Sequence, residues 1–460
     1  MNDKLSPSIF KAYDIRGVVD KTLTEEACYL IGQALGTKAV ALGVEKICVG
    51  RDGRLTGERL QKNLMNGIRS TGVGVIDIGM VATPILYFAT KFLGTGSGVA
   101  ITGSHNPPEY NGLKMMLAND TLFGEGIQEL RKMIEEGALL SGKEGSYEKV
   151  DVVEDYLNSI TSDVKVFRPM RIAVDAGNGV AGPNAVKLFK RMGLDVEELF
   201  TDIDGHFPNH HPDPSKPENL KALQKALAEG DAEVGLAFDG DGDRLGVVTK
   251  DGEIIFPDRL AMLFAEDILK KKDGAIIVTD VKCTRNIRPF VEGHGGKSIM
   301  SRTGHSFIKA KIKEVNADFA AEMSGHIFFN DRWPGFDDGV YAGARLVEVL
   351  SKAGNANELL KNLPNAVSTP ELQIPTAEGE NFTLVEKLKE QAKFDDAERI
   401  IDIDGIRVEW KDGFALARPS NTTPVVVLRF EADSKEGLAR IQDQFRKEIE
   451  NVAPDAKIPF

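Results

Sequence analysis

The sequence predicts an α/β protein of several domains with largely parallel sheets. Short apolar, strand-like runs alternate with amphipathic helical stretches such as residues 24–41 and 219–229, and this alternation is typical of α/β folds. A chain of 460 residues is also too long for a single hydrophobic core, which favours two to four domains. No low-complexity segment and no short-period repeat interrupts the pattern.

Three successive α/β units are predicted from a repetition at the scale of domains. In each unit one strand-like run ends in a polar or glycine-containing turn, and a later run ends in a dense polar cluster. Ligands bind at the carboxyl ends of strands in open α/β sheets, so we expect the three clusters to converge on one cleft. The first runs are residues 46–54, 171–179 and 275–283, and the second runs are residues 98–107, 234–244 and 317–326.

The last part of the chain has a different, α+β character. RVEWKDGFALARP (407–419) predicts two strands joined at the Asp-Gly turn of residues 412–413. Residues 424–432 predict a further strand, and residues 434–451 predict a helix. A fourth domain follows from this pattern. The predicted domains are residues 1–150, 151–252, 253–366 and 367–460.

Composition limits the classes of function. Hydrophobic residues at 42% and charged residues at 28% are ordinary for a soluble protein. The chain shows neither a bilayer-spanning apolar run nor a signal-peptide pattern, so we expect no membrane partner and a cytoplasmic location. Three widely spaced cysteines indicate neither a disulfide framework nor a zinc site. The net charge of −13 argues against nucleic-acid binding, and an anionic ligand would require positive charge gathered locally in a cleft.

The motif DGDGDR (239–244) predicts a cation site. Asp239, Asp241 and Asp243 alternate with glycines that let the backbone curl, and hard carboxylate oxygens suit Mg²⁺ or Ca²⁺. An EF-hand is excluded, because Arg244 stands where that loop needs glycine and Lys250 stands where it needs glutamate. Mg²⁺ is usually shared with phosphate. The alternative is a solvated acidic turn, which the mutual repulsion of three carboxylates disfavours.

The segment ITGSHNPPEY (101–110) places a serine beside a histidine, yet it does not predict a hydrolase. The nucleophile elbow requires G-x-S-x-G, and the sequence around Ser104 is T-G-S-H-N. His105 is not made a triad partner by adjacency, since triads are set by geometry. A phosphoester on Ser104 fits better, because residues 239–244, which we call the acidic loop, offer the metal and Lys114 offers a nearby cation. The alternative is a serine turn without chemistry.

The remaining polar clusters are individually weaker signals. EMSGH (322–326) has the hydrogen-bonding groups that suit a polyol such as a sugar, although a solvated loop would explain it equally well. RPSNTTP (418–424) suits a phosphate held away from the reacting centre, or is a polar turn before a strand. His305 is a candidate for phosphate contact or acid–base work. We interpret His206, His210 and His211, in a Pro- and Asn-rich loop, mainly as structural residues.

Taken together, the motifs carry a resemblance. AYDIRG (12–17), TGSHNPP (102–108), DGDGDR (239–244), AEMSGH (321–326) and RPSNTTP (418–424) stand in an order and spacing similar to those of the α-D-phosphohexomutases. The resemblance is greatest to the bacterial phosphomannomutase/phosphoglucomutase group, and it covers essentially the whole chain. One departure is small, because Ala321 stands where the family commonly has glycine.

The resemblance implies a fold and a set of site residues. The implied fold is α/β, with three similar α/β domains with mixed sheets around a central cleft, plus a C-terminal α+β domain. Ser104 would be the phosphoserine, and Mg²⁺ would be held by Asp239, Asp241, Asp243 and a Ser104 phosphate oxygen. Sugar recognition is implied for Glu322, Ser324 and His326. The residues implied to bind phosphate or line the cleft are Tyr13, Arg16, Lys114, Arg244, Lys282, His305, Arg418, Ser420, Asn421 and Thr422.

The implied activity is that of an isomerase for small-molecule sugar phosphates. Phosphoserine 104 would donate its phosphoryl group to a hexose 1-phosphate and form a hexose 1,6-bisphosphate, which reorients and returns its other phosphate. Arg16, Lys114 and His305 are candidates for assisting catalysis, and movement of the fourth domain would release the product. The sequence leaves glucose and mannose open. The alternatives are a Mg²⁺-dependent phosphatase with an aspartate nucleophile and a sugar-phosphate-binding protein without turnover.

Overall fold

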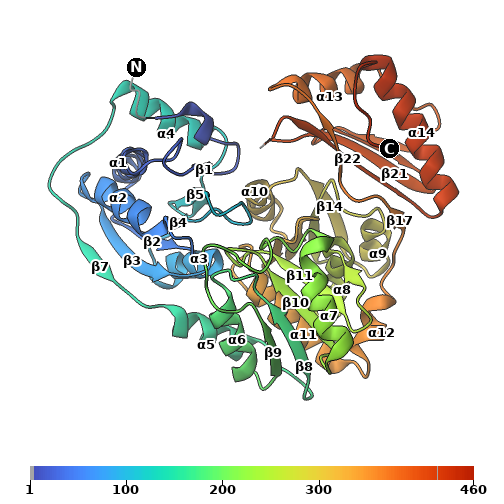
Figure 1. The fold of residues 1–460 in the computed structure, drawn as a ribbon, viewed down its shortest axis with the longest axis horizontal. Helices are drawn as coiled ribbons and strands as arrows, with labels where there is room; N and C mark the ends of the chain where they lie inside the picture. The colour runs from blue at the N-terminus through green and yellow to red at the C-terminus, as the bar shows by residue number, and fades with distance from the viewer. Residues whose placement is uncertain (1–4, 422) are drawn as a thin grey trace. The chain divides into compact units, whose positions relative to one another are not determined.

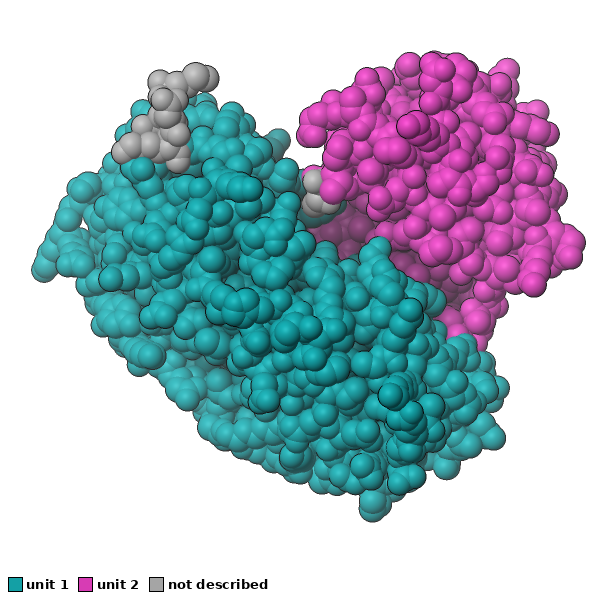
Figure 2. Space-filling view, in the orientation of Figure 1, with its two compact units in different colours: residues 1–257, 324–362 teal, residues 258–323, 363–460 magenta. Residues whose placement is uncertain are grey.

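The computed structural model describes residues 5–421 and 423–460. The chain forms two compact units, one of residues 1–257 and 324–362 and the other of residues 258–323 and 363–460 (Figure 2). Sheets flanked by helices make up both units (Figure 1). Among the described residues, no helix is both long and apolar enough to cross a membrane.

The first sheet of the first unit is mixed, with the strand order β1-β5-β4-β2-β3-β7 and β6 paired to β5. Strands β4, β2, β3 and β7 are parallel, whereas β1 and β5 run antiparallel to their neighbours. The bounds are β1 (Ile15–Val18), β2 (Lys46–Arg51), β3 (Gly74–Met80), β4 (Gly98–Ile101), β5 (Tyr110–Leu117), β6 (Asp120–Thr121) and β7 (Tyr147–Lys149).

Helices cover both faces of this sheet. Apolar side chains of α1, α2 and α4 form one core with Val99 and Ile101 of β4. Side chains alternate along a strand, and α3 packs on the opposite face, where a Cβ at Gly98 would lie 2.6 Å from Thr90 Cγ2. The helices are η1 (Pro7–Ile9), α1 (Glu25–Ala41), α2 (Gly57–Arg69), α3 (Thr83–Phe92), α4 (Glu125–Glu136) and α5 (Val153–Asp163).

The second sheet of the first unit has the order β12-β11-β10-β8-β9. The β9-β8-β10 part is parallel, and β11 and β12 are antiparallel. Helix α7 covers the face that contains Ala237, while α6 and α11 cover the face of Leu236 and Phe238. The elements are β8 (Arg171–Asp175), α6 (Gly182–Arg191), β9 (Asp195–Leu199), η2 (Pro217–Leu220), α7 (Lys221–Glu229), β10 (Val234–Phe238), β11 (Leu245–Thr249), β12 (Ile254–Ile255), α11 (Gly339–Lys352) and α12 (Ala356–Lys361). The first unit also contains β16 (Ile327–Phe329), which is not a strand of this sheet.

The second unit contains three parallel strands and a separate antiparallel sheet. Strands β14, β13 and β15 lie side by side in parallel. The antiparallel sheet has the order β17-β22-β21-β20-β19 with β18 paired to β22, and α13 and α14 share its core. The elements are α8 (Pro257–Leu269), β13 (Ile276–Asp280), α9 (Ile287–Gly293), β14 (Lys297–Ser301), α10 (His305–Val315), β15 (Phe319–Ala321), β17 (Val367–Ser368), β18 (Leu372–Pro375), α13 (Glu380–Gln391), β19 (Arg399–Ile401), β20 (Ile406–Trp410), β21 (Gly413–Pro419), β22 (Val425–Ala432) and α14 (Lys435–Val452).

The predicted elements are present, with one correction to the sheets. The helix predicted over residues 24–41 is α1, which begins after Thr24 because the Thr24 side chain accepts a hydrogen bond from the Ala27 N–H at 3.1 Å. The predicted Asp-Gly turn joins β20 to β21 in an antiparallel hairpin. The expectation of largely parallel sheets was incomplete, since antiparallel strands flank the parallel strands of both first-unit sheets.

Candidate functional site

The loop that carries Ser104, residues 102–109, begins where β4 ends, and we call it the serine loop. Ser104 adopts a left-handed backbone conformation, with φ 50°, and its side chain is buried. Its Oγ lies 3.2 Å from Asp239 Oδ2 and 3.1 Å from His105 Nδ1. The predicted meeting of the serine and acidic loops is therefore present in the first unit. The contact with His105, to which sequence reasoning assigned no role, is a finding of the structure.

Arg54 holds the serine loop in place, and this residue was not identified from the sequence. Its guanidinium donates to four backbone carbonyls, those of Ser104 at 2.8 Å, Asn106 at 2.6 Å, Pro107 at 2.6 Å and Tyr110 at 3.0 Å. The side chain of Arg54 is fully buried, and its bond to the Ser104 carbonyl is shielded from water. One cation thus fixes the course of the loop from Ser104 to Tyr110.

The partner of Arg54 is Asp52, from the turn after β2. Asp52 Oδ2 lies 3.2 Å from Arg54 Nε and also accepts the Gly103 N–H at 3.2 Å. A Cβ at Gly103 would lie 2.4 Å from Arg54 Cζ, so only glycine lets the guanidinium approach the loop this closely. In the sequence, Asp52 and Arg54 are recognisable only as part of a polar turn that follows a strand. Nothing in the sequence indicates that this turn contacts the serine loop.

The acidic loop follows β10 and packs directly against the serine loop. Asp239, Asp241 and Asp243 are completely buried, and each offers a ligand atom within 4.8 Å of the others. A Cβ at Gly240 would lie 2.4 Å from the Ser104 carbonyl oxygen, so glycine is required where the two loops touch. The alternating aspartates thus point to one side, as the sequence predicts.

Two basic residues neutralise part of this charge. Lys114, on β5, places Nζ 2.8 Å from Asp241 Oδ2 and also pairs with Asp243. The backbone N–H of Arg244 donates to Asp239 Oδ1 at 3.1 Å, and its guanidinium Nε lies 3.8 Å from Asp239 Oδ2. Lys114 and Arg244 are thus paired with the aspartates, and the expected gathering of positive charge around an anionic ligand stays a prediction.

The aspartates do not share one electrostatic environment. Burial, together with the charges of Asp243 and Asp241, raises the pKa of Asp239 well above its ordinary value. Burial acts in the same direction on Asp243, but Lys114 and His326 outweigh it and hold the pKa of Asp243 well below its ordinary value. Ionisation of Asp239 therefore calls for further positive charge.

The acidic loop fits a divalent cation. Among the described side chains, Asp241 Oδ1 is a buried carboxylate oxygen without a hydrogen-bond partner, while Asp241 Oδ2 accepts from Lys114. A buried carboxylate oxygen without a partner is costly unless a cation completes it. Three hard oxygen donors match the preference of Mg²⁺. The residues present thus fit the predicted Mg²⁺ site.

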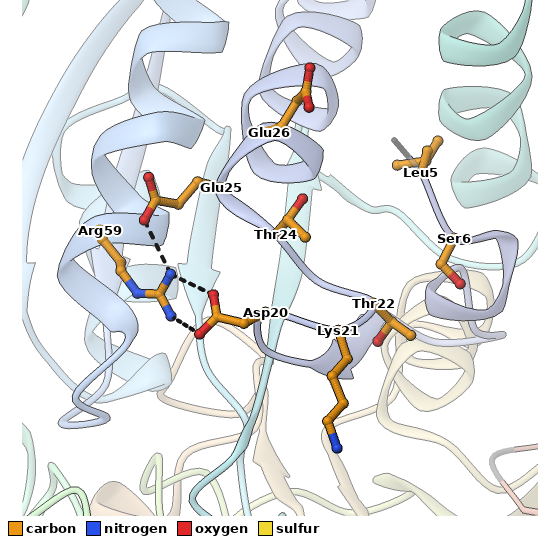
Figure 3. Close-up of a pocket in the computed structure, with 9 residues that line it drawn as sticks. All are labelled: Leu5, Ser6, Asp20, Lys21, Thr22, Thr24, Glu25, Glu26 and Arg59. Carbon is orange, nitrogen blue, oxygen red and sulfur yellow. Dashed lines mark hydrogen bonds and ion pairs between the residues drawn. The ribbon is translucent and has the colours of Figure 1, made fainter. Parts of the chain in front are cut away.

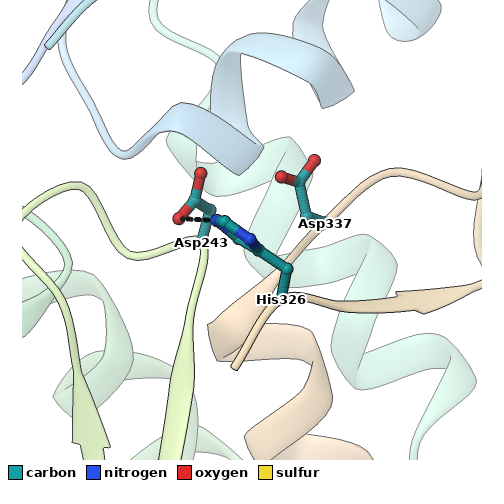
Figure 4. Close-up of side chains that lie close together, drawn as sticks. All are labelled: Asp243, His326 and Asp337. Carbon is teal, nitrogen blue, oxygen red and sulfur yellow. Dashed lines mark hydrogen bonds and ion pairs between the residues drawn. The ribbon is translucent and has the colours of Figure 1, made fainter. Parts of the chain in front are cut away.

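A second group of possible metal ligands shares Asp243 with the acidic loop. It consists of Asp243, His326 and Asp337, all buried, and Figure 4 shows their side chains turned towards one another. His326 Nε2 lies 3.1 Å from Asp243 Oδ1, and His326 Nδ1 lies 3.3 Å from Ser324 Oγ. Two of the predicted sugar-binding residues, Ser324 and His326, therefore adjoin the acidic loop within the first unit.

Residues of β1 approach the serine loop from the other side. Arg16 Nη1 donates to Asn106 Oδ1 at 2.8 Å, and its second terminal nitrogen pairs with Asp14. Strand β1 pairs with β5, which carries Lys114, and Arg16 lies opposite Gly112. Tyr13 lies two residues before the start of β1 and is half-buried. The AYDIRG and TGSHNPP motifs are thus joined by a hydrogen bond.

Part of the predicted recognition set lies in the second unit. Glu322 follows β15, is buried, and accepts a hydrogen bond from the Gly304 N–H. Gly304 directly precedes His305, the first residue of α10, so the hydrogen bond places Glu322 beside the start of this helix. The predicted residues of this unit are Lys282, His305, Glu322, Arg418, Ser420 and Asn421.

The cations of the second unit are held by carboxylates that sequence reasoning did not single out. Arg418 Nε donates to Asp404 Oδ2 at 2.9 Å, and Lys282 Nζ lies 2.6 Å from Glu371 Oε1. Burial alone would lower the pKa of Lys282, but Glu371 and Asp280 reverse the effect and raise it. Lys282 is therefore charged, as anion binding would require.

The predicted phosphate loop follows β21 in the same unit. Ser420 Oγ lies 3.0 Å from Thr423 Oγ1, and Asn381 donates to the Ser420 carbonyl at 2.9 Å. Asn421 is half-buried. Thr422, which the sequence also predicts to bind phosphate, lies outside the described residues.

The structure thus brings together the predicted residues of each unit separately. The first unit joins Ser104 to the three aspartates, Lys114, Arg16, Arg244, Ser324 and His326. The boundary between the units falls between Met323 and Ser324. A joint role for Glu322 and Ser324 in binding one sugar, and the approach of second-unit residues to Ser104, therefore remain predictions.

The three histidines of the loop at residues 206–211 have separate partners. His210 Nε2 lies 3.0 Å from both carboxylate oxygens of Asp175, whereas the exposed His206 pairs with Asp204 at 2.9 Å. Neither group of possible metal ligands found among the described residues includes them. His211 contacts the backbone of His105, so this loop packs beside the serine loop.

A cavity of about 550 Å³ lies elsewhere in the first unit, near the start of α1 (Figure 3). Arg59 spans part of it, 2.7 Å from Asp20 Oδ2 and 3.1 Å from Glu25 Oε1. The charges that line the cavity are thus largely paired with one another, and none of the predicted site residues contributes to it. Its lining is Leu5, Ser6, Asp20, Lys21, Thr22, Thr24, Glu25, Glu26 and Arg59.

Four domain models of one protein family match this chain in order. Three are described as phosphoglucomutase/phosphomannomutase alpha/beta/alpha domains I, II and III, and they match residues 7–139, 154–252 and 256–367. The fourth is described as the phosphoglucomutase/phosphomannomutase C-terminal domain and matches residues 371–448. Together the matches cover most of the chain.

Whole-chain comparisons point to the same family. A phosphoglucomutase of Neisseria meningitidis is 56% identical over 449 residues, which cover 97% of this chain and 98% of that protein. A phosphomannomutase/phosphoglucomutase of Pseudomonas aeruginosa is 50% identical over 457 residues, covering 99% and 98%. The crystal structure of a phosphoglucomutase/phosphomannomutase family protein from Burkholderia thailandensis is similar with a TM-score of 0.95 and 54% identity, over 99% of this chain and 100% of that one.

Proposed function

The chain belongs to the phosphoglucomutase/phosphomannomutase family of isomerases, and from this premise we propose how it works. It interconverts a hexose 1-phosphate and a hexose 6-phosphate, with glucose or mannose as the sugar. Ser104 carries the phosphoryl group, and a hexose 1,6-bisphosphate is the intermediate, which also activates any enzyme that has lost its phosphate. The partners are small sugar phosphates.

The observation that carries this proposal is the contact between Ser104 and the acidic loop. Ser104 Oγ lies 3.2 Å from Asp239 Oδ2, although the two residues are 135 positions apart in the chain. A serine hydroxyl beside three buried carboxylates is poorly placed to attack an anionic phosphate unless a cation neutralises them. A phosphoryl carrier that shares a divalent cation with the carboxylates accounts for both features.

Asp239, Asp241 and Asp243 would hold Mg²⁺, together with a phosphate oxygen on Ser104. When bound, Mg²⁺ supplies positive charge against the negative charge that develops on the transferred phosphoryl group. The chain already contributes to the same balance through Lys114, whose Nζ lies 2.8 Å from Asp241 Oδ2 in a buried position. Because such charges are fixed before the reaction, little reorganisation is needed when the phosphoryl group moves.

Alignment of the serine is the second contribution of the protein. Arg54 holds the carbonyls around Ser104, and Arg16 is bonded to Asn106 on the same loop. A fixed carrier lets the substrate hydroxyl approach the phosphorus in line, which replaces a collision in solution by an oriented encounter. We assign Arg16, Lys114 and His305 as candidates for assisting proton transfer to and from the substrate hydroxyl.

Recognition of the rest of the substrate is proposed for two groups. Glu322, Ser324 and His326 would bind sugar hydroxyls, and Arg418, Ser420, Asn421 and Thr422 would bind the non-reacting phosphate. Tyr13, Arg244 and Lys282 are proposed as further residues that line the substrate cleft. Because the bisphosphate must present each of its phosphates to Ser104 in turn, both groups must accept the sugar in two orientations.

The domain limits and the location of the enzyme are also part of the proposal. We retain domain boundaries near residues 150, 252 and 366. Successive domains then carry Ser104, the acidic loop, the EMSGH segment (322–326) and the RPSNTTP segment (418–424). We propose the cytoplasm as the compartment, because three free cysteines suit a reducing environment.

The proposal is tested by replacing the carrier. Wild-type protein with Mg²⁺, glucose 1-phosphate and a trace of glucose 1,6-bisphosphate should form glucose 6-phosphate, and mannose 1-phosphate should be assayed in parallel. Ser104→Ala should lose roughly a thousand-fold or more of this activity, as loss of a covalent carrier does. Ser97→Ala is the matched control, because Ser97 is a buried serine immediately before β4, the strand that leads to the loop of Ser104.

Two results would argue against the proposal. A Ser104→Ala variant that still released inorganic phosphate at the wild-type rate would favour a phosphatase with an aspartate nucleophile. Absence of hexose 6-phosphate in the wild type, together with absence of phosphate on Ser104 by mass spectrometry after incubation with the bisphosphate, would exclude the mutase mechanism.

A further inference from the structure

We propose that Thr83 is a positioning residue for the metal site, which it serves by orienting the Asp241 carboxylate. Thr83 is the first residue of α3 and lies 158 positions before Asp241 in the chain. The inference rests on the proposed Mg²⁺ site, and it concerns a residue outside every motif identified in the sequence.

The contact between Thr83 and Asp241 has two parts. Thr83 Oγ1 donates to Asp241 Oδ2 at 2.6 Å, and the Thr83 N–H donates to the Asp241 carbonyl oxygen at 2.9 Å. Thr83 is 2% exposed and Asp241 is completely buried, so water does not compete for either bond. The backbone bond places the loop, and the hydroxyl bond sets the rotation of the carboxylate.

The rotation of the Asp241 carboxylate determines which oxygen is available to a cation. Oδ2 accepts from Thr83 and from Lys114 Nζ at 2.8 Å, whereas Oδ1 is the buried oxygen without a hydrogen-bond partner among the described residues. The hydroxyl and the ammonium therefore hold one oxygen and leave the other buried and free to bind a cation. Partners that orient a ligand in this way commonly strengthen metal binding by 10- to 100-fold.

The surroundings of Thr83 make it a rigid support. Helix α3 packs on the first sheet through buried residues, and the β-branched threonine side chain has few rotamers in a helix. Gly242 of the acidic loop lies next to Thr83's neighbour Ala82, since a Cβ at Gly242 would be 3.3 Å from Ala82 Cβ and 2.7 Å from Ala181 Cβ. The loop thus lies against the residues that precede α3 and α6, which limits how far its backbone can shift.

Replacement of the hydroxyl alone tests the inference. Thr83→Val keeps the shape of the side chain and the backbone N–H, and removes only the donor to Asp241 Oδ2. Thr83→Ser keeps the donor. Thr90→Val is the matched control, because Thr90 is completely buried on the same helix and its hydroxyl donates to the Tyr87 carbonyl at 2.8 Å, not to the acidic loop.

The measurement is the affinity for Mn²⁺, a paramagnetic substitute for Mg²⁺, titrated by electron paramagnetic resonance on the unphosphorylated protein, with thermal melting as a check of folding. We expect the dissociation constant of Thr83→Val to rise about 10-fold or more, while Thr83→Ser and Thr90→Val stay within about 3-fold of the wild type. If Thr83→Val does not fold, Thr83→Ala replaces it, because alanine adds no atoms to the site.

The outcomes separate this inference from the proposed function. Equal Mn²⁺ affinity of the wild type and a folded Thr83→Val or Thr83→Ala variant would overturn the role of Thr83 while leaving the metal site intact. A similar loss of affinity in Thr90→Val would also overturn it, since the effect would then be a general one of helix α3. Absence of Mn²⁺ binding in the wild type would instead contradict the proposed metal site itself.

Discussion

Arg54 illustrates, at the scale of single residues, how a reactive loop can depend on a side chain remote from it in sequence. Its guanidinium donates to the carbonyl of Ser104 and to those of three later residues of the loop. No other residue type combines a planar fork of five donors with a permanent charge. Lysine would keep the charge but not the geometry. A carbonyl left without a donor lowers the free energy of unfolding, and the loss is greatest for the buried carbonyl of Ser104.

We predict that Arg54→Lys lowers kcat on the order of 100-fold, because displacement of the serine loop misaligns the phosphoryl group. It should also reduce the free energy of unfolding by about 3 kcal/mol through carbonyls left without donors. Steady-state kinetics and urea unfolding measure the two effects. The control is Arg51→Lys, since Arg51 is half-buried and donates to one carbonyl, that of Asp52 at 3.3 Å. Unchanged kcat in Arg54→Lys would contradict the positioning role.

His210 makes the stability of the protein depend on pH. Burial alone would lower the pKa of His210, but the Asp175 carboxylate, 3.0 Å away, outweighs burial and raises it. A raised folded pKa stabilises the native state fully below the unfolded pKa of about 6.5, and this stabilisation is lost as the pH rises through the folded value. His210→Gln should therefore lower the free energy of unfolding more at pH 6 than at pH 9, and the two losses should differ by on the order of 1 kcal/mol.

Urea unfolding of the wild type and of His210→Gln at both pH values measures this difference. The control is His294→Gln, because the His294 ring is exposed and bonds a backbone carbonyl, that of Phe290, instead of a carboxylate. An equal cost of His210→Gln at pH 6 and pH 9 would show that the ion pair with Asp175 does not contribute.

At the scale of elements, the crossing of α1 and α2 depends on the absence of a side chain. A Cβ at Gly67 of α2 would lie 2.0 Å from the Tyr29 carbonyl oxygen on α1, and one at Gly32 of α1 would lie 2.2 Å from the Leu64 carbonyl oxygen. Such distances are far inside van der Waals contact. The two helices therefore approach one another more closely than any residue with a Cβ would allow.

Gly67→Ala should reduce the free energy of unfolding by about 2 kcal/mol, because overpacking outweighs the better helix propensity of alanine. Gly142→Ala should change it by less than about 0.5 kcal/mol, since a Cβ there would meet no atom within 4 Å. Urea denaturation of both variants gives the comparison. A Gly67→Ala variant as stable as Gly142→Ala would mean that the helices separate at no cost.

The elements themselves were largely predictable from sequence because their signals are local. Strand β13 occupies residues 276–280 of the predicted run 275–283, and α14 occupies residues 435–452 against a prediction of 434–451. Apolar runs, helix periodicity and caps act over a few neighbouring residues. The antiparallel strands β5 and β11 could not be assigned in this way, because their direction depends on partners distant in the chain.

At the scale of the whole molecule, burial protects the three cysteines. Cys28, Cys48 and Cys283 are free and buried. Burial raises the pKa of Cys28 to about 12 and that of Cys48 to about 11, and burial followed by the Asp280 charge raises the pKa of Cys283 well above its ordinary value. Only a thiolate reacts rapidly with electrophiles, so each thiol is doubly protected.

Native protein at pH 8 should therefore show essentially no reaction with Ellman's reagent over an hour, whereas unfolded protein should show three thiols per chain. The absorbance of the released thiolate measures both. A thiol that reacts within seconds in the native protein would indicate that one of the cysteine environments opens readily.

The sequence by itself determined the α/β class, the elements and the motifs around Ser104 and the three aspartates, because each of these is encoded in residues close together in the chain. Only the tertiary structure decided which side chains support the motifs. Arg54 meets Ser104 from 50 positions away, and Thr83 meets Asp241 from 158 positions away. Neither residue carries a local signal of its partner, because a buried hydrogen bond depends on where two loops converge in space, and that convergence is a property of the packed sheets and helices.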